Sequence, residues 1–196
     1  MLSRAEAAEV AAPGEDGASA MAATAPEPVA VALREIDRFA AFAAERLRAD
    51  TRICALSRAG WDTHRGQASA IVRPLARLER LVLRLKTDLG PAVWARTAVL
   101  AVTEFGRTVR ENGSGGTDHG TGGVALTAGG ALRGGQVRGR WPGLGDLYDG
   151  RDLLPTTDVR AVAAWTMRGL YGFGRGFLEG TVFPGLDMGD DLRLVL

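Results

Sequence analysis

Apolar patterns typical of helices alternate with patterns typical of strands between residues 29 and 105, and this order limits the folds open to the chain. Over 29–49 and 71–89, apolar residues recur at intervals of three and four, which predicts two amphipathic helices. The two apolar stripes consist of Leu33, Ile36, Ala40, Ala43 and Leu47, and of Ile71, Leu75, Leu78, Val82, Leu85 and Leu89. Short apolar runs at 52–58 and 97–105 predict strands before and after the second helix, which Gly90-Pro91 ends.

The order strand, helix, strand predicts a right-handed βαβ crossover, because parallel strands of one sheet are joined in this way. The run Ala98–Val102 is apolar on both faces, as in a central strand of a parallel sheet. We therefore expect an α/β fold, with a mostly parallel sheet and flanking helices.

Beyond residue 105, the patterns predict one more strand and one more helix. The strand covers 123–129, and the helix covers 158–170 with a cap from Thr157 or Asp158. The tail from Gly172 onward is predicted to be irregular.

The composition is that of a globular domain, with 46% hydrophobic and 24% charged residues. No apolar run approaches the roughly 20 residues that cross a membrane. Lys and Arg number 24 against 23 Asp and Glu, so the net charge of +1 argues against a nucleic-acid binder. Residues 1–28 predict a flexible low-complexity leader before a folded part, 29–196, and they lack the apolar core of a secretory signal. We expect a cytoplasmic protein, and the single cysteine, Cys54, excludes a disulfide within the chain.

The chain has only two histidines, and both lie beside aspartates in loops that contain glycine. Asp62 and His64 are two residues apart, so in an extended segment their side chains point to the same side. Asp118 and His119 are adjacent, in the sequence GTDHG. A carboxylate with an imidazole is a common donor set for divalent cations. A single pair of this kind is more often a cap or a surface hydrogen bond than a set of metal ligands, and two such pairs together make a metal site an equal alternative.

Two further polar residues follow the strongest predicted strand. Glu104 ends the run and could act as a ligand or base, or could only cap the following loop. Arg107 could hold an oxyanion through its planar guanidinium, or could only pair with Asp118. Neither a GxxxxGK[ST] phosphate loop nor a GxSxG nucleophile elbow occurs in the sequence, which argues against a nucleotide site and an α/β-hydrolase triad.

An ordered series of motifs resembles the domain-of-unknown-function 1501 (DUF1501) family, which is similar to the alkaline phosphatase–sulfatase superfamily. The resemblance covers roughly residues 50–187. It is carried by GWDTH (60–64), TEFGRT (103–108), NGSGGTDHG (112–120), GGQVRGRWPGL (134–144), GRDLLPTTDVRAV (150–162) and FPG (183–185).

The resemblance implies a metal-dependent hydrolase of phosphate or sulfate esters, with an α/β sandwich that holds one or two divalent cations, zinc or manganese. Asp62, His64 and His119 would be ligands, and Asp118 a ligand or the partner of one. Glu104 would stand where the superfamily commonly has an aspartate, and Phe105 would replace the histidine that follows it.

The resemblance also implies that only the carboxyl-terminal half of such a domain is present, because residues 1–50 offer no nucleophile at a predicted strand end. Half a sheet would expose edges that a partner could cover. The alternative function is a non-catalytic remnant or binding module that retains at most one metal ion.

Overall fold

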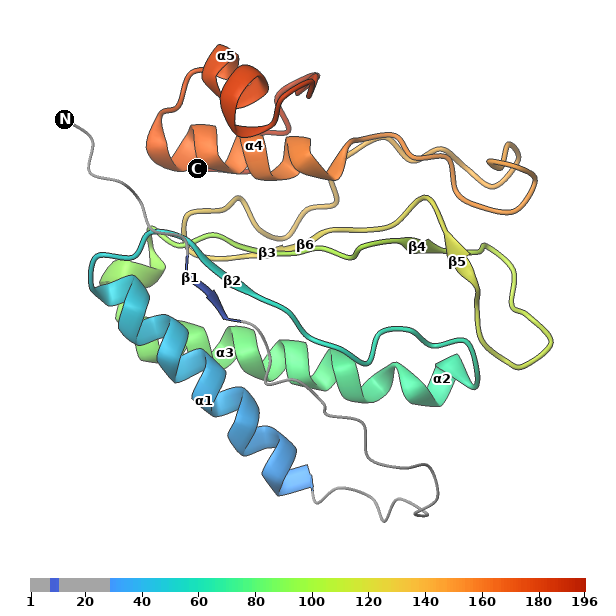
Figure 1. The fold of residues 1–196 in the computed structure, drawn as a ribbon, viewed down its shortest axis with the longest axis horizontal. Coiled ribbons are helices and arrows are strands. Elements are labelled where there is room, and N and C mark those ends of the chain that lie inside the picture. Colours follow the sequence, from blue (N-terminus) through green and yellow to red (C-terminus); the bar gives the residue numbers. More distant parts are fainter. Residues whose placement is uncertain (1–7, 11–28) are drawn as a thin grey trace. The chain divides into compact units, whose positions relative to one another are not determined.

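The computed structural model describes residues 8–10 and 29–196 (Figure 1). These residues form two compact units. Among the described residues, unit 1 comprises those up to Asp62 together with Ala70–Val93, and unit 2 comprises Thr63–Ser69 with Trp94–Leu196. Apart from Ala8–Val10, the predicted leader 1–28 lies outside the described residues. Within the described part of the chain, no helix is both long enough and apolar enough to span a bilayer.

Two long helices, α1 (Val29–Arg48) and α3 (Val72–Trp94), provide most of unit 1. Ile36, Ala40 and Ala43 of α1 are buried, as the three- and four-residue spacing predicts. In α3 the buried stripe differs from the predicted one: Leu81 is buried and Leu75 is 46% exposed. Gly90, with φ 70°, interrupts the helical backbone near the predicted end, and one further turn follows it.

Charged side chains join α1 to α3 within unit 1. Arg80 donates from Nε to Asp37 Oδ1 at 2.9 Å and from Nη2 to Asp37 Oδ2 at 2.7 Å. These two bonds lower the pKa of Asp37, first through the hydrogen bond and then through the charge of Arg80. Arg48 Nη1 donates to the carbonyl oxygen of Asp88 at 3.1 Å.

The predicted mostly parallel sheet is wrong. Among the described residues, the strands form three separate two-stranded sheets. Only the pair of β1 (Ala8–Val10) with β2 (Cys54–Leu56) is parallel. β3 (Val99–Ala101) pairs antiparallel with β6 (Leu126–Ala128), and β4 (Gly106–Arg107) pairs antiparallel with β5 (His119–Gly120). The predicted βαβ crossover is wrong as well, because β2 and β3 belong to different sheets.

The burial of β3, the strongest strand prediction, explains why the parallel sheet does not form. A central parallel strand is buried on both faces, whereas all three residues of β3 are only half-buried and the following Val102 is 52% exposed. Its neighbour is the next apolar segment of the chain rather than a strand beyond a helix. The mixture of helices and strands remains that of an α/β protein.

Helix α4 (Val159–Tyr171) carries the core of unit 2. The carboxylate of Asp158 caps it by accepting from the backbone N–H of Arg160 at 2.8 Å, which confirms the predicted start. Gly172, in the left-handed conformation at φ 71°, ends it.

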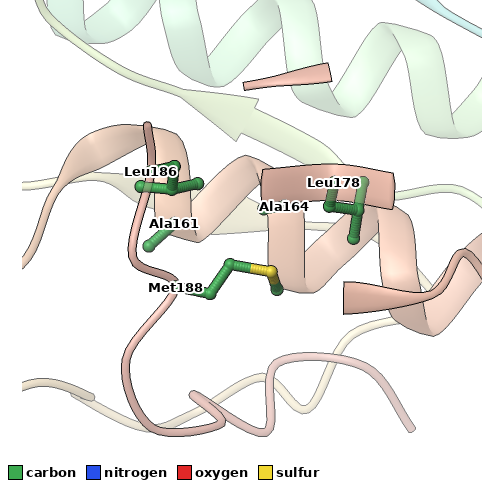
Figure 2. Close-up of a cluster of buried hydrophobic side chains, with 5 residues drawn as sticks. All are labelled: Ala161, Ala164, Leu178, Leu186 and Met188. Carbon is green, nitrogen blue, oxygen red and sulfur yellow. The ribbon is translucent and has the colours of Figure 1, made fainter. Parts of the chain in front are cut away.

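The tail predicted to be irregular folds onto α4. It forms α5 (Arg175–Phe177) and the π-helix η1 (Leu178–Val182). Leu178, Leu186 and Met188 pack against two alanines of α4, Ala161 and Ala164, in a buried cluster (Figure 2). The two small side chains leave room for the tail to approach the helix, and Trp165 Nε1 donates to the carbonyl of Met188 at 2.9 Å.

Candidate metal centre

Backbone hydrogen bonds join two loops that are distant in the sequence, 63–67 and 112–118. The N–H groups of Gly66 and Gln67 donate to the carbonyls of Ser114 and Gly115 at 3.1 and 2.7 Å. Thr117 donates back from its N–H to the carbonyl of Thr63 at 3.3 Å. Donors and acceptors on both loops are therefore satisfied by one another, which holds the loops side by side.

Glycines permit the close approach of these segments. A Cβ atom on Gly116 would lie 2.3 Å from the carbonyl carbon of His64, and one on Gly120 would lie 2.6 Å from that of Arg107. No side chain fits at such separations, so the glycines on either side of Asp118 and His119 have a steric role.

Three side chains meet where the loops join. Asp62, His64 and His119 each offer a ligand atom, and these atoms all lie within 4.8 Å of one another. His64 is half-buried, and Asp62 and His119 are exposed. His119 lies on β5 opposite Arg107 of β4, so the short hairpin sets its position. The imidazole centroids of His64 and His119 are 4.9 Å apart.

Asp118 contacts the site through His64. Its Oδ1 atom lies 3.0 Å from Nδ1 of His64 and also accepts from Nδ2 of Asn112 at 3.0 Å. The hydrogen bond from Asn112, followed by that from His64, lowers the pKa of Asp118 below its ordinary value. Asp118 is therefore a carboxylate at neutral pH.

His119 is held by aromatic contacts. Its ring stacks on Phe105, with centroids 3.7 Å apart and planes inclined at 18°. The guanidinium of Arg107 lies 5.1 Å from the centroid of the same phenyl ring, and Arg107 Nη1 donates to the carbonyl of Thr117 at 2.9 Å. Arg107 lies directly opposite His119 in the β4–β5 pair, and Phe105, on the bend just before β4, stacks on the His119 ring.

A family model described as "Protein of unknown function (DUF1501)" matches residues 2–161 of the chain. The protein belongs to the DUF1501 family. The match starts upstream of the motifs that carry the resemblance and ends just inside α4. No curated protein and no solved structure matches the chain.

In this DUF1501 protein, the fold brings together three of the predicted ligands, Asp62, His64 and His119. Asp118 lies behind His64 as its hydrogen-bond partner, and Arg107 lies beside Phe105 and Thr117. Glu104 has an exposed side chain on the bend between β3 and β4 and is outside the three-residue group.

Asn112 was missed by the sequence reasoning, although it organises the second loop. Its Oδ1 atom accepts from the N–H groups of Ser114 and Gly116, at 2.9 and 3.2 Å. Its Nδ2 atom donates to the carbonyl of His64 at 3.1 Å as well as to Asp118. The one available signal was that Asn112 is the only asparagine in the chain and starts a glycine-rich turn.

The donor set fits a divalent cation. Two imidazoles and one carboxylate suit zinc, manganese or iron(II). Tetrahedral zinc, with bonds of about 2.0–2.1 Å, separates its ligand atoms by roughly 3.4 Å. The spread of up to 4.8 Å therefore requires an inward movement on the order of 1 Å. Three protein ligands leave a coordination position for water or substrate, as catalytic zinc sites do.

Proposed function

We propose that this DUF1501 protein is a metal-dependent hydrolase of phosphate or sulfate esters. The observation that carries the proposal is the convergence of Asp62, His64 and His119 from two loops. The motif resemblance to the alkaline phosphatase–sulfatase superfamily supports the substrate class. In this proposal, the motifs correspond to the carboxyl-terminal half of a domain of that superfamily.

Asp62, His64 and His119 would hold zinc or manganese, and Asp118 would support His64 through Nδ1. A bound cation of this kind polarises an ester oxygen and lowers the pKa of a coordinated water. Arg107 would supply positive charge to an anionic ester, since its guanidinium is beside the Phe105 ring on which His119 stacks. Glu104 would act as a base, because its carboxylate is exposed.

Metal binding tests the assignment directly. We expect the purified full chain to bind zinc or manganese at one ion per chain, measured by calorimetry and by metal analysis after gel filtration. His119→Ala and Asp62→Asn each remove a ligand and should abolish stoichiometric binding. Asp146→Asn is the matched control, because Asp146 is an exposed aspartate outside the three-residue group. Unchanged stoichiometry in His119→Ala would exclude the site.

Hydrolysis is tested with aryl phosphate and aryl sulfate esters, with added zinc or manganese and with a chelator. Turnover that the chelator abolishes and that Asp62→Asn lowers supports the hydrolase. Metal binding without turnover would instead indicate a non-catalytic module that holds one ion.

A further inference from the structure

The orientation of the Asn112 amide is determined by two backbone groups. The N–H groups of Ser114 and Gly116 can only donate, and both point to the same atom of the amide. That atom must be the carbonyl oxygen, Oδ1, because the NH₂ group accepts no hydrogen bonds. The other amide atom is therefore Nδ2, which can only donate.

The same reasoning extends from Asn112 to the imidazole of His64. Nδ2 of Asn112 lies 3.0 Å from Oδ1 of Asp118, so this oxygen is an acceptor. Nδ1 of His64 lies 3.0 Å from the same oxygen. Asn112 and His64 therefore contact the same acceptor oxygen. Because an acceptor needs a donor as its partner, Nδ1 of His64 must carry a proton and donate it. In a neutral imidazole, the lone pair is then on Nε2.

We infer that Asn112 is a positioning residue that fixes the tautomer of His64 and so makes Nε2 its cation-binding atom. Asn112 also donates to the carbonyl oxygen of His64, so a single side chain holds both the backbone of the ligand residue and the partner of its ring. This inference rests on the proposed metal function only in its last step, because the tautomer exists without an ion.

Because the chain has only two histidines, the tautomer of His64 can be measured in the full, metal-free protein. With only two histidines, protein labelled with ¹⁵N-histidine gives two imidazole spin systems in a long-range ¹H–¹⁵N correlation spectrum. A His119→Ala sample identifies the ring of His64. In the neutral ring, we expect the wild-type protein to show His64 protonated on Nδ1 and unprotonated on Nε2.

The decisive variant is Asn112→Asp. One carboxylate oxygen still accepts from Ser114 and Gly116, so the turn is kept. The other oxygen is negatively charged and repels the carboxylate of Asp118, which should move away from Nδ1 of His64. We expect a mixture of His64 tautomers and a zinc dissociation constant about 10–100-fold larger.

Gln67→Glu is the matched control, because it makes the same amide-to-carboxylate change in the facing loop. Gln67 uses Oε1 to accept from Thr117, which a glutamate can also do, and Asn112 rather than Gln67 contacts the His64–Asp118 pair. We expect wild-type tautomer and zinc affinity. Circular dichroism verifies folding, and if Asn112→Asp is unfolded, Asp118→Ala replaces it, because this variant removes the acceptor without altering the bonds of Asn112 Oδ1.

Two results would overturn the assignment: a wild-type His64 that carries its proton on Nε2, or a His64 spectrum unchanged in the decisive variant. The expected tautomers without zinc binding in any sample would support the positioning role of Asn112 and contradict the proposed function instead.

Discussion

The two histidines of the site are fixed by different physical means. His64 is oriented by the hydrogen bond between its ring and Asp118 and by the one that its carbonyl oxygen accepts from Asn112, whereas His119 stacks on the phenyl ring of Phe105. Hydrogen bonds fix which nitrogen carries a proton, and stacking fixes only the plane of the ring. The sensitivity of the site to substitution should therefore differ between the two.

Phe105→Leu should weaken metal binding without removing it. An aromatic pair contributes about 0.5–1.5 kcal/mol beyond the burial of its area, so loss of the stack should raise the zinc dissociation constant by roughly 2–12-fold. Phe42→Leu is the control, since Phe42 on α1 also lies beneath an arginine, Arg46. Calorimetric titration with zinc measures the dissociation constant of each variant. An equal zinc affinity in Phe105→Leu and wild type would exclude a role for the Phe105–His119 stack.

At the residue scale, the sequence indicated the residues of the candidate site, and it did not indicate the residues that hold them in place. Asp62 with His64 and Asp118 with His119 stand out because histidine is rare in this chain and each imidazole has a nearby carboxylate. Asn112 acts through the polarity of its amide, which depends on a turn that the spacing of residues does not specify.

At the scale of elements, helices were easier to predict than strands. The stripe of α1 repeats over several turns, and the cap at Asp158 marks the start of α4. The strands have two or three residues each, and an apolar run this short does not indicate which other strand it pairs with. Asp118 and His119 were expected in a loop that contains glycine, but His119 lies on β5, which pairs antiparallel with β4, and reaches the site from there.

Gly116→Ala tests the loop contact that brings the pairs together. The added methyl group would overlap the carbonyl of His64, and relief of the overlap would part the loops. We expect a loss of about 1–3 kcal/mol in the free energy of unfolding, and at least tenfold weaker zinc binding.

Gly113→Ala is the control for this substitution, because a Cβ atom there meets nothing within 4 Å. Urea denaturation and zinc titration compare the two variants. Wild-type zinc affinity in Gly116→Ala would show that the approach of the loops is not required.

At the scale of the whole molecule, a mixture of helices and strands was predicted correctly, and the arrangement of the strands was not. A parallel sheet follows from the sequence only if the apolar runs are buried on both faces, and β3 is half-buried. The α4 cluster forms a second core, because the tail that looked irregular contributes Leu178, Leu186 and Met188.

Leu178→Ala should therefore destabilise unit 2. Leu178 is fully buried, and a leucine-to-alanine change in a core costs about 2–5 kcal/mol in the free energy of unfolding. Leu144→Ala is the matched control, since Leu144 is 61% exposed. Chemical denaturation followed by tryptophan fluorescence, with Trp165 packed against the cluster, reports the difference. Equal midpoints in the two variants would contradict the assignment of the tail to the core.

His64 and Asp118 are 54 residues apart in the sequence, and this separation has a consequence for the order of folding and metal binding. An unfolded polypeptide presents its two imidazoles as independent, weak donors, and the chelate arises when the intervening segment has closed. Ion uptake should thus coincide with the last stage of renaturation, so that a colorimetric zinc indicator mixed with refolding protein would time the meeting of the loops.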